Sequence, residues 1–299
     1  MAVIAILAPG VMGAGLAARL YASGSGSILT NLEGRSAATR ERAAQAHMEH
    51  ASYVDIVQRA THIYSVVPPG EASAVAQTIL DAYKESGTTH KLIFADCNAI
   101  NVQSVKHMAA LFVDSGITFL DGSIIGLPPS ANFNPAIYLS GHADDGAALE
   151  SFVTAGVGLN IVPLRGDGAG IGDASAVKMA HSGVVKGLLG LFSTSILAAN
   201  ASSPSTAGGL LHALQHTQPA LVQFAAKLLP QALPKAYRFV AEMDEVGGFV
   251  GGNLNGAQTF EGLSATFSRI ADADARTPPG LEIELLLKFA EEAQKIQSN

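Results

Sequence analysis

The first half of the chain alternates short apolar runs with longer stretches of mixed polarity. Continuous apolar runs predict strands that are covered on both faces. The predicted strands are Val3–Leu7, Ile28–Leu32, His62–Val67, Leu92–Asp96, Thr118–Asp121, Ala136–Ser140 and Asn160–Pro163. The predicted helices between them are Val11–Ser23, Ala37–Ala46, Ala72–Ser86, Val102–Ser115 and Gly146–Ala155. Strands that alternate with helices indicate a parallel sheet with crossover helices, an α/β fold.

The pattern changes after Pro163, where the strand-like runs stop. The Gly-rich segment 165–172 is typical of a linker, and from Ala174 onward the apolar positions recur at helical spacing. A long helix, apolar nearly all round, is predicted over Ala174–Asn200, and such a helix is buried in a core or between subunits. We therefore predict two domains, an α/β domain over 1–165 and an all-α domain over 166–299.

Two later segments have compositions that disfavour a continuous helix. Gly247–Gly252 predicts a break between helices, and the polar tail Glu291–Asn299 is expected to fray.

Composition narrows the functional classes. The chain is 48% hydrophobic and 14% charged, so it buries enough apolar surface to fold, unlike a disordered protein. The 18 basic and 25 acidic residues give a net charge of −7, which argues against a nucleic-acid surface. The most apolar stretch, Gly183–Ala199, is interrupted by Lys186 and by Ser193–Ser195, whereas a membrane span needs about 20 apolar residues. We expect no membrane insertion.

Cysteine content and the start of the chain bear on the compartment. The lone cysteine, Cys97, cannot form an internal disulfide. Residues 1–7 are apolar but lack the basic segment of a signal peptide. We expect a cytoplasmic protein.

A glycine turn joins the first predicted strand to the first helix. Its residues are Ala8-Pro9-Gly10-Val11-Met12-Gly13. In a strand–turn–helix unit of this kind, backbone N–H groups at the helix start bind a pyrophosphate, and a Cβ would block its approach. Ala8 stands where the usual first glycine would be, so a purely structural turn is the alternative. Placement at the start of a βαβ pattern favours a dinucleotide site at Gly10, Val11, Met12 and Gly13, in a Rossmann domain.

The end of the second predicted strand is where such a site reads the ribose. Glu33 is suited to ribose hydroxyls, as in NAD sites. Arg35 and Ser36, with Thr39 and Arg40 one helical turn later, are suited to a 2′-phosphate. A solvated surface arginine is the alternative interpretation. We expect NADP(H) to be favoured over NAD(H).

The ordered motifs resemble the β-hydroxyacid dehydrogenase and 6-phosphogluconate dehydrogenase superfamily. The segments that carry the resemblance are Gly10–Gly13, Gly34–Ser36, Val66–Pro69, Asp96–Ala99, Asp121–Gly126 and Ala174–Met179. The resemblance implies hydride transfer between NAD(P) and a small substrate, and a homodimer in which one helical domain completes the other subunit's site. It also implies that Lys178 is catalytic, that Val67, Pro68 and Asn98 lie against the cofactor, and that Ser123, Ile124, Ile125 and Gly126 bind substrate.

Three features depart from the superfamily pattern. Ile125 stands where hydroxyacid dehydrogenases bind the substrate carboxylate with a serine, and Ser182 stands where they have an asparagine. The run Asp121–Ile124 is closer to the imine reductases, which usually have Asp or Tyr at the position of Lys178. The overall resemblance is greatest to a phosphogluconate-dehydrogenase-like subgroup.

Lys178 lies near the start of the predicted apolar helix. Burial disfavours an ammonium ion, which makes such a lysine a usable acid or base near neutral pH. A lysine that reaches into solvent from a helix end is the alternative. Ser182 and His181 follow at one-turn spacing and could orient Lys178 or touch the substrate, although His181 is equally suited to packing. Lys186 lies away from the helix face shared by Lys178 and Ser182, and it could pair with an acidic residue.

Other polar residues are weaker candidates. Asn98 offers a donor and an acceptor near the nicotinamide or simply forms a turn, and Ser123 could replace the hydroxyl lost at Ile125. The acidic cluster Glu242, Asp244 and Glu245 is most simply a solvated helix face. The alternatives are that it binds a substrate amine or that it pairs with Lys178 across a dimer. His and Cys spacings give no metal-ligand set, so we expect no metal.

The sequence therefore predicts an NADPH-dependent oxidoreductase that acts on a small carbonyl or alcohol, with Lys178 as general acid/base. The enzyme alternative is an imine reductase, because Ile125 suits a substrate without a carboxylate. The alternative from another class is a non-catalytic NADP-binding regulatory protein, given the altered glycine and serine positions.

Overall fold

The computed structural model describes residues 2–251 and 256–297. The chain divides into two compact units, Met1–Lys178 and Met179–Asn299, and the division falls inside one long helix, α7 (Asp173–Ser202). The boundary predicted near residue 165 lies just after the last strand and before this helix.

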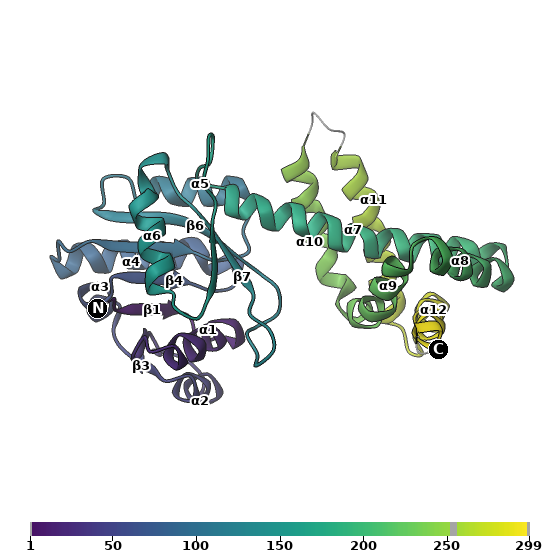
Figure 1. Cartoon of the computed structure of the whole chain (residues 1–299), viewed down its shortest axis with the longest axis horizontal. Coiled ribbons are helices and arrows are strands. Elements are labelled where there is room, and N and C mark those ends of the chain that lie inside the picture. Colours follow the sequence, from purple (N-terminus) through teal and green to yellow (C-terminus); the bar gives the residue numbers. More distant parts are fainter. Residues whose placement is uncertain (1, 252–255, 298–299) are drawn as a thin grey trace. The chain divides into compact units, whose positions relative to one another are not determined.

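The first unit is built on one sheet. Eight strands of the described chain lie in the order β3-β2-β1-β4-β5-β6-β7-β8. Figure 1 labels β1, β3, β4, β6 and β7 of this sheet. Their bounds are β1 Ile4–Leu7, β2 Ile28–Thr30, β3 Met48–His50, β4 His62–Ser65, β5 Leu92–Asp96, β6 Ile117–Ile125, β7 Ala136–Ser140 and β8 Asn160–Pro163. Neighbouring strands are parallel except for β6 and β7, which are antiparallel. The predicted α/β class is confirmed.

Helices cover both faces of this sheet, because side chains of successive strand residues point to opposite faces. In β1, Ile4 and Ile6 join one apolar core, whereas Ala5 and Leu7 join the other. The first core contains α1 (Val11–Ala22), α2 (Ala37–Gln45) and α6 (Gly146–Ala155). The second contains α3 (Tyr53–Arg59), α4 (Ala72–Ser86) and α5 (Val102–Leu111). Short 3₁₀ turns, η1 (Pro69–Glu71) and η2 (Ala143–Asp145), precede α4 and α6.

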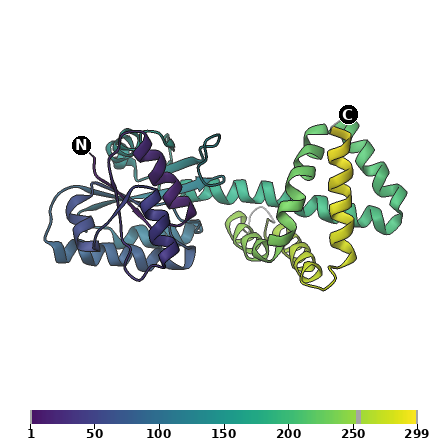
Figure 2. The same cartoon turned by 90° about the horizontal axis from the view of Figure 1, so that it is seen from below.

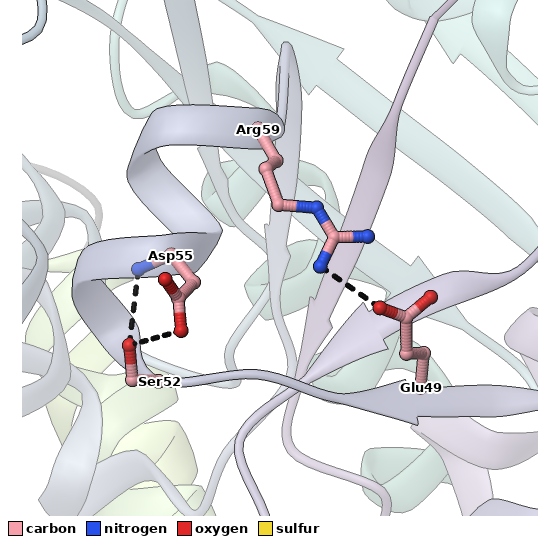
Figure 3. A network of polar contacts seen from close by, with 4 residues as sticks. All are labelled: Glu49, Ser52, Asp55 and Arg59. Carbon is pink, nitrogen blue, oxygen red and sulfur yellow. Dashed lines mark hydrogen bonds and ion pairs between the residues drawn. The ribbon is translucent and has the colours of Figure 1, made fainter.

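The sequence pattern missed β3 and α3. Both are short, and only Met48 of β3 is buried, so neither gives a long periodic signal. Polar contacts define their ends (Figure 3). Ser52 Oγ accepts from the backbone N–H of Asp55 at 3.1 Å and donates to its carboxylate at 2.7 Å, which caps α3. Arg59 in the last turn pairs with Glu49 of β3 at 2.8 Å.

Strand β6 is longer than predicted. The apolar run predicts a strand over Thr118–Asp121. Instead Asp121–Ile125 pairs with β7. The strand continues because the Asp121 carboxylate finds buried hydrogen-bond donors, and because Gly122 leaves room for Cys97, whose Sγ would lie 2.7 Å from an added Cβ.

The second unit is helical. It comprises the later part of α7, α8 (Pro204–Thr217), α9 (Pro219–Ala232), η3 (Leu233–Lys235), α10 (Ala236–Val250), α11 (Gly256–Asp274) and α12 (Leu281–Gln297), the last drawn in yellow in Figure 2. These helices share one core, to which α7 contributes Leu189 and Ile196. Gly190 lets α7 approach α11 closely, because an added Cβ would lie 2.6 Å from Leu263. The predicted all-α second part is confirmed.

The break between helices predicted within Gly247–Gly252 is found at the later part of that segment. Helix α10 passes through Gly247, which packs against Phe260 of α11, and ends at Val250; Gly252 lies outside the described residues. The prediction for the tail was wrong. The tail does not fray at Glu291. Helix α12 reaches Gln297 because Phe289 and Ala293 are buried in the core. Residues 298–299 lie outside the described residues.

Helix α7 bears on the expectation that no stretch of the chain is long and apolar enough to cross a membrane. Among described helices it alone is long and apolar enough to cross a membrane, with a mean hydropathy of 1.5 over its most apolar window. The core helix of a soluble protein meets the same criteria. Met179, Leu189, Phe192 and Ile196 of α7 pack into the core of the second unit, and 39% of the apolar window is buried.

Candidate active site at the carboxyl edge of the sheet

The glycine turn lies between β1 and α1. Gly10 is the residue that precedes α1, and an added Cβ there would have no heavy atom of the described chain within 4 Å. Val11 is 63% exposed, and Met12 is half-buried. A Cβ at Gly13, by contrast, would overlap the carbonyl oxygen of Ala8. The turn thus combines open space at its tip with tight helix–strand packing behind it, which fits the approach of a dinucleotide pyrophosphate.

The segment after β2 is held in shape by Asn31. Its side chain donates to Ala51 O at 3.2 Å and accepts from the N–H of Glu33 at 3.0 Å. Glu33 and Ser36 are exposed and Arg35 is half-buried. Ser36 caps α2 by accepting from the N–H of Thr39 at 3.3 Å. The three predicted ribose-site residues therefore lie together at the end of β2.

Tyr53 joins this group, although the sequence pattern did not single it out. It is half-buried at the start of α3. Burial raises the pKa of Tyr53, the Arg35 guanidinium opposes the rise, and the carboxylates of Glu33 and Glu71 add to it. Arg35, Glu33 and Glu71 therefore lie close enough to act on one phenol. Only the fold brings these three segments together.

Asn98 links the ends of β4 and β5. It is 2% exposed, and its Oδ1 accepts from the N–H of Val67 at 2.6 Å. Its amide donates to Ser65 Oγ at 3.0 Å and to Asp96. Both amide protons thus have protein acceptors, so Asn98 holds the strand ends together. Val67 is buried and Pro68 is exposed at the same edge.

Asp121 anchors the start of α7. This carboxylate is fully buried, and its Oδ2 accepts from the N–H groups of Gly172 and Ser175, both at 3.0 Å, and from Ser140 Oγ at 3.2 Å. Its Oδ1 accepts from Ser175 Oγ at 2.7 Å. Burial raises the pKa of Asp121, and these hydrogen bonds oppose the rise. A carboxylate at a helix start satisfies free N–H groups and complements the helix dipole.

Lys178 lies three residues after Ser175 on α7, hence on the same helix face. Its charge lowers the pKa of both Asp96 and Cys97, against the larger effect of burial, so it lies near the end of β5. Lys178 is thereby brought to the carboxyl edge of the sheet.

The predicted companions of Lys178 have other contacts. Ser182 accepts a hydrogen bond from Lys186 Nζ at 2.8 Å, and Lys186 also pairs with Glu242 of α10. The expected acidic partner of Lys186 is thus found. Burial and the Lys186 charge both lower the pKa of His181, which is exposed. Glu242 is therefore an ion-pair partner rather than only a solvated residue.

The predicted substrate segment is largely inside the sheet. Ser123 is fully buried, and its Oγ has no hydrogen-bond partner among the described residues. Ile124 is buried in the core beside α1, whereas Ile125 is half-buried at the strand end. Gly126 follows with a φ of 128°, and an added Cβ would lie 2.6 Å from the Phe133 ring. Of the predicted substrate-binding residues, Ser123 and Ile124 are buried, whereas Ile125 and Gly126 are accessible at the end of the strand.

Asp96 and Asp121 were not predicted as site residues. Each ends a predicted strand, and the carboxyl ends of parallel strands meet at the ligand-binding edge. Their place at the ends of predicted strands is the feature of the sequence that could have identified them. No group of three metal-ligating side chains is found within residues 2–251 and 256–297.

Comparisons with known proteins agree with this architecture. The family model described as the NAD binding domain of 6-phosphogluconate dehydrogenase matches residues 3–161, and a domain of unknown function matches residues 201–270. No curated protein matches the chain. A solved protein of unknown function, described as structurally similar to 3-hydroxyacid dehydrogenases, is 25% identical with a TM-score of 0.70, over 91% of this chain and 97% of that one.

Two further solved structures show the same fold. The 3-hydroxyisobutyrate dehydrogenase of Mycobacterium tuberculosis is 17% identical, with a TM-score of 0.65 over 96% of this chain and 98% of its own. An imine reductase variant of Myxococcus stipitatus, solved with NAD⁺, is 17% identical, with a TM-score of 0.56 over 97% and 99%. Since the family model covers more than half of the sequence, the chain belongs to the family of the NAD binding domain of 6-phosphogluconate dehydrogenase, and it is an NAD(P)-dependent dehydrogenase or reductase.

Proposed function

We propose that this protein transfers hydride between NADPH and a small carbonyl or alcohol, with Lys178 as the general acid/base. One observation carries the proposal. Lys178 stands one turn after Ser175, whose hydrogen bonds to Asp121 fix the start of α7 at the carboxyl edge of the sheet. The glycine turn before α1 opens at the same edge of a parallel sheet.

The residues fit a bound dinucleotide. The N–H groups of the first turn of α1 would hold its pyrophosphate, and a bound nicotinamide would supply or accept the hydride. In reduction, Lys178 Nζ donates a proton to the carbonyl oxygen as the alcohol forms. In oxidation, the neutral amine removes the hydroxyl proton. General acid–base catalysis of this kind contributes about 100-fold or more to the rate.

The preference for NADPH rests on Arg35 and Ser36. Arg35 lies in the loop after β2 and Arg40 in the first part of α2, and Arg40 Nε donates to Arg35 O at 3.1 Å. Glu33 would repel a 2′-phosphate and favour NADH, so the two side chains oppose one another.

Imine reduction is the second candidate. It is favoured by Ile125, a half-buried hydrocarbon at the end of β6 that offers no donor to a substrate carboxylate. The name of the imine reductase neighbour is consistent with it.

We further propose that the protein is a cytoplasmic homodimer. Helix α7 supports the dimer, since Val184 is 62% exposed and Leu191 is 58% exposed, seven residues apart on one face. Exposed apolar side chains on one helix face are expected to meet a second surface. With Cys97 as the single cysteine, and buried, nothing calls for an oxidising compartment.

The test is a panel of aldehydes, ketones, alcohols, hydroxyacids and imines, assayed in both directions with NADPH and NADH. We expect turnover of a carbonyl or alcohol with NADPH. Lys178→Ala should lower turnover about 100-fold while cofactor affinity, measured by titration, stays unchanged. Lys178→Ala with unchanged turnover would remove Lys178 from the mechanism, and turnover of imines alone would favour the second candidate.

A further inference from the structure

Asp96, the last residue of β5, is a buried carboxyl group with one oxygen unsatisfied. It is 0% exposed. Oδ1 accepts from the amide of Asn98, whereas Oδ2 is buried and has no hydrogen-bond partner in the part of the chain that the structure describes. An ionised carboxylate with an unpaired buried oxygen is costly. Such a group prefers to carry a proton.

The neighbouring carboxylate, Asp121, has hydrogen-bond donors for both of its oxygens. Asp96 and Asp121 are register partners on β5 and β6, and Asp121 accepts four hydrogen bonds whereas Asp96 accepts one from Asn98. Two adjacent carboxyl groups in unequal surroundings titrate apart, with the poorly satisfied one protonated first. Asp96 is therefore the group of this pair that takes up a proton first as the pH falls.

Three charged or titratable groups lie near Asp96. Asp121 lies on β6, Lys178 on α7 and Cys97 next to it in the chain, while its neighbour on β4 is the uncharged Ser65. Burial raises the pKa of Asp96 to about 7; the Asn98 amide opposes this rise, Asp121 adds to it, and the Lys178 charge opposes it. The position of Lys178 has an independent geometric basis, because Ser175 on the same face of α7 is bonded to Asp121.

We propose that Asp96 is a positioning residue whose ionisation sets the proton affinity of Lys178. This proposal rests on the proposed function of Lys178. An ionised Asp96 favours the ammonium form of Lys178, which gives a proton to the substrate oxygen, whereas a protonated Asp96 favours the neutral amine, which removes one. Asp96 is fully buried and acts through its charge, whereas Lys178 is half-buried.

The experiment measures the proton affinity of Lys178 without any substrate. The full-length protein is treated with cyanate across a pH series, and carbamylation of Lys178 is followed by mass spectrometry of its peptide. The wild type is compared with Asp96→Asn, which keeps the size of the side chain, and with Asp96→Ala in case the amide disturbs folding. Asp81→Asn removes an exposed carboxylate from α4 and serves as the matched control.

We expect Asp96→Asn to lower the midpoint of Lys178 labelling by about one pH unit or more, as removal of a nearby opposite charge does. The wild-type profile should show two steps and the variant one, as for coupled groups. In turnover, the inflection near pH 7 should disappear. A labelling midpoint equal to that of the wild type, in a variant with unchanged circular dichroism, would overturn the proposal.

The two proposals fail separately. If Lys178→Ala keeps its turnover, the acid/base function of Lys178 is wrong, although cyanate labelling still reports whether Asp96 sets its charge. If Lys178→Ala is inactive and Asp96→Asn changes neither profile, Lys178 is catalytic and Asp96 has no part in it.

Discussion

Ser175 is bound to Asp121 twice, through its hydroxyl group to Oδ1 at 2.7 Å and through its backbone N–H to Oδ2 at 3.0 Å. These bonds join the middle of β6 to the first turn of α7, across more than fifty residues of sequence. The start of the helix that bears Lys178 is therefore fixed by one buried carboxylate.

Loss of that carboxylate should weaken the protein measurably. Asp121→Asn replaces an acceptor oxygen by a donor that faces the N–H groups of α7. We expect the free energy of unfolding to fall by about 3 kcal/mol, as when a buried charged partner is removed. Urea denaturation followed by circular dichroism measures it. Ser140→Ala, which removes a single hydroxyl from the same cluster, should cost about 1 kcal/mol. Equal losses in the two variants would contradict the anchoring role of Asp121.

The two glycines of the first turn should respond differently to alanine. Gly10→Ala meets no neighbouring atom, so the unfolding free energy should stay unchanged while dinucleotide affinity falls, because the Cβ projects where the pyrophosphate approaches. Gly13→Ala overlaps the carbonyl oxygen of Ala8 and should lower stability itself. Thermal unfolding and fluorescence titration with NADPH separate the two effects. A Gly10→Ala protein that binds NADPH as tightly as the wild type would place the cofactor elsewhere.

Arg35 should decide between the two cofactors. Arg35→Ala removes a charge-assisted contact to a 2′-phosphate, so NADPH affinity should fall about tenfold or more while NADH affinity changes little. Titration with both cofactors gives the ratio. Arg59→Ala is the matched control, because this arginine pairs with Glu49 on β3 (Figure 3). An unchanged NADPH/NADH ratio in Arg35→Ala would exclude Arg35 from the site.

His62 should make stability depend on pH. Burial lowers the pKa of His62 to about 4 from 6.5, and its ring nitrogens contact Thr61 and Ser151. The unfolded chain therefore binds a proton before the folded one does. The free energy of unfolding should be constant with respect to this group above pH 6.5 and fall as the pH drops from 6.5 towards 4.

The measurement is urea denaturation at several pH values. His62→Gln should be less stable at neutral pH, since two hydrogen bonds change, but should lose part of the slope between pH 6.5 and 4. His107→Gln, an exposed residue of α5, should keep the wild-type slope. If His62→Gln keeps the full slope, another group causes the acid sensitivity.

The exposed face of α7 should form the dimer interface. Leu191→Glu places a charge among apolar side chains and should convert a dimer to monomers in light scattering. Leu127→Glu, at a 72% exposed position in the first unit, should leave the dimer intact. A wild-type protein that scatters as a monomer at micromolar concentration would overturn the dimer proposal.

Local sequence was sufficient to predict the elements whose bounds depend on residues a few positions apart. The glycine turn, the strands β5, β7 and β8, and the helices α4 and α6 have the predicted bounds or residues, because apolar runs, Gly and Pro act within a few positions. The segment Met48–Arg59 was missed because each of its elements is too short for a periodic signal.

Partnerships between distant residues were decided only by the tertiary structure. The sequence placed Lys178, Asn98 and Ser123 among the candidates, but not the bonds that Asn98 makes to Val67 and Ser65, nor the burial of Ser123. The sequence placed Asp121 at the end of a predicted strand and gave no hydrogen-bond partner for it. The start of α7 supplies those donors from residues 172–175. A pattern of polarity records which residues tend to be buried, whereas hydrogen-bond partners and charges that meet across the sheet depend on how the whole chain folds.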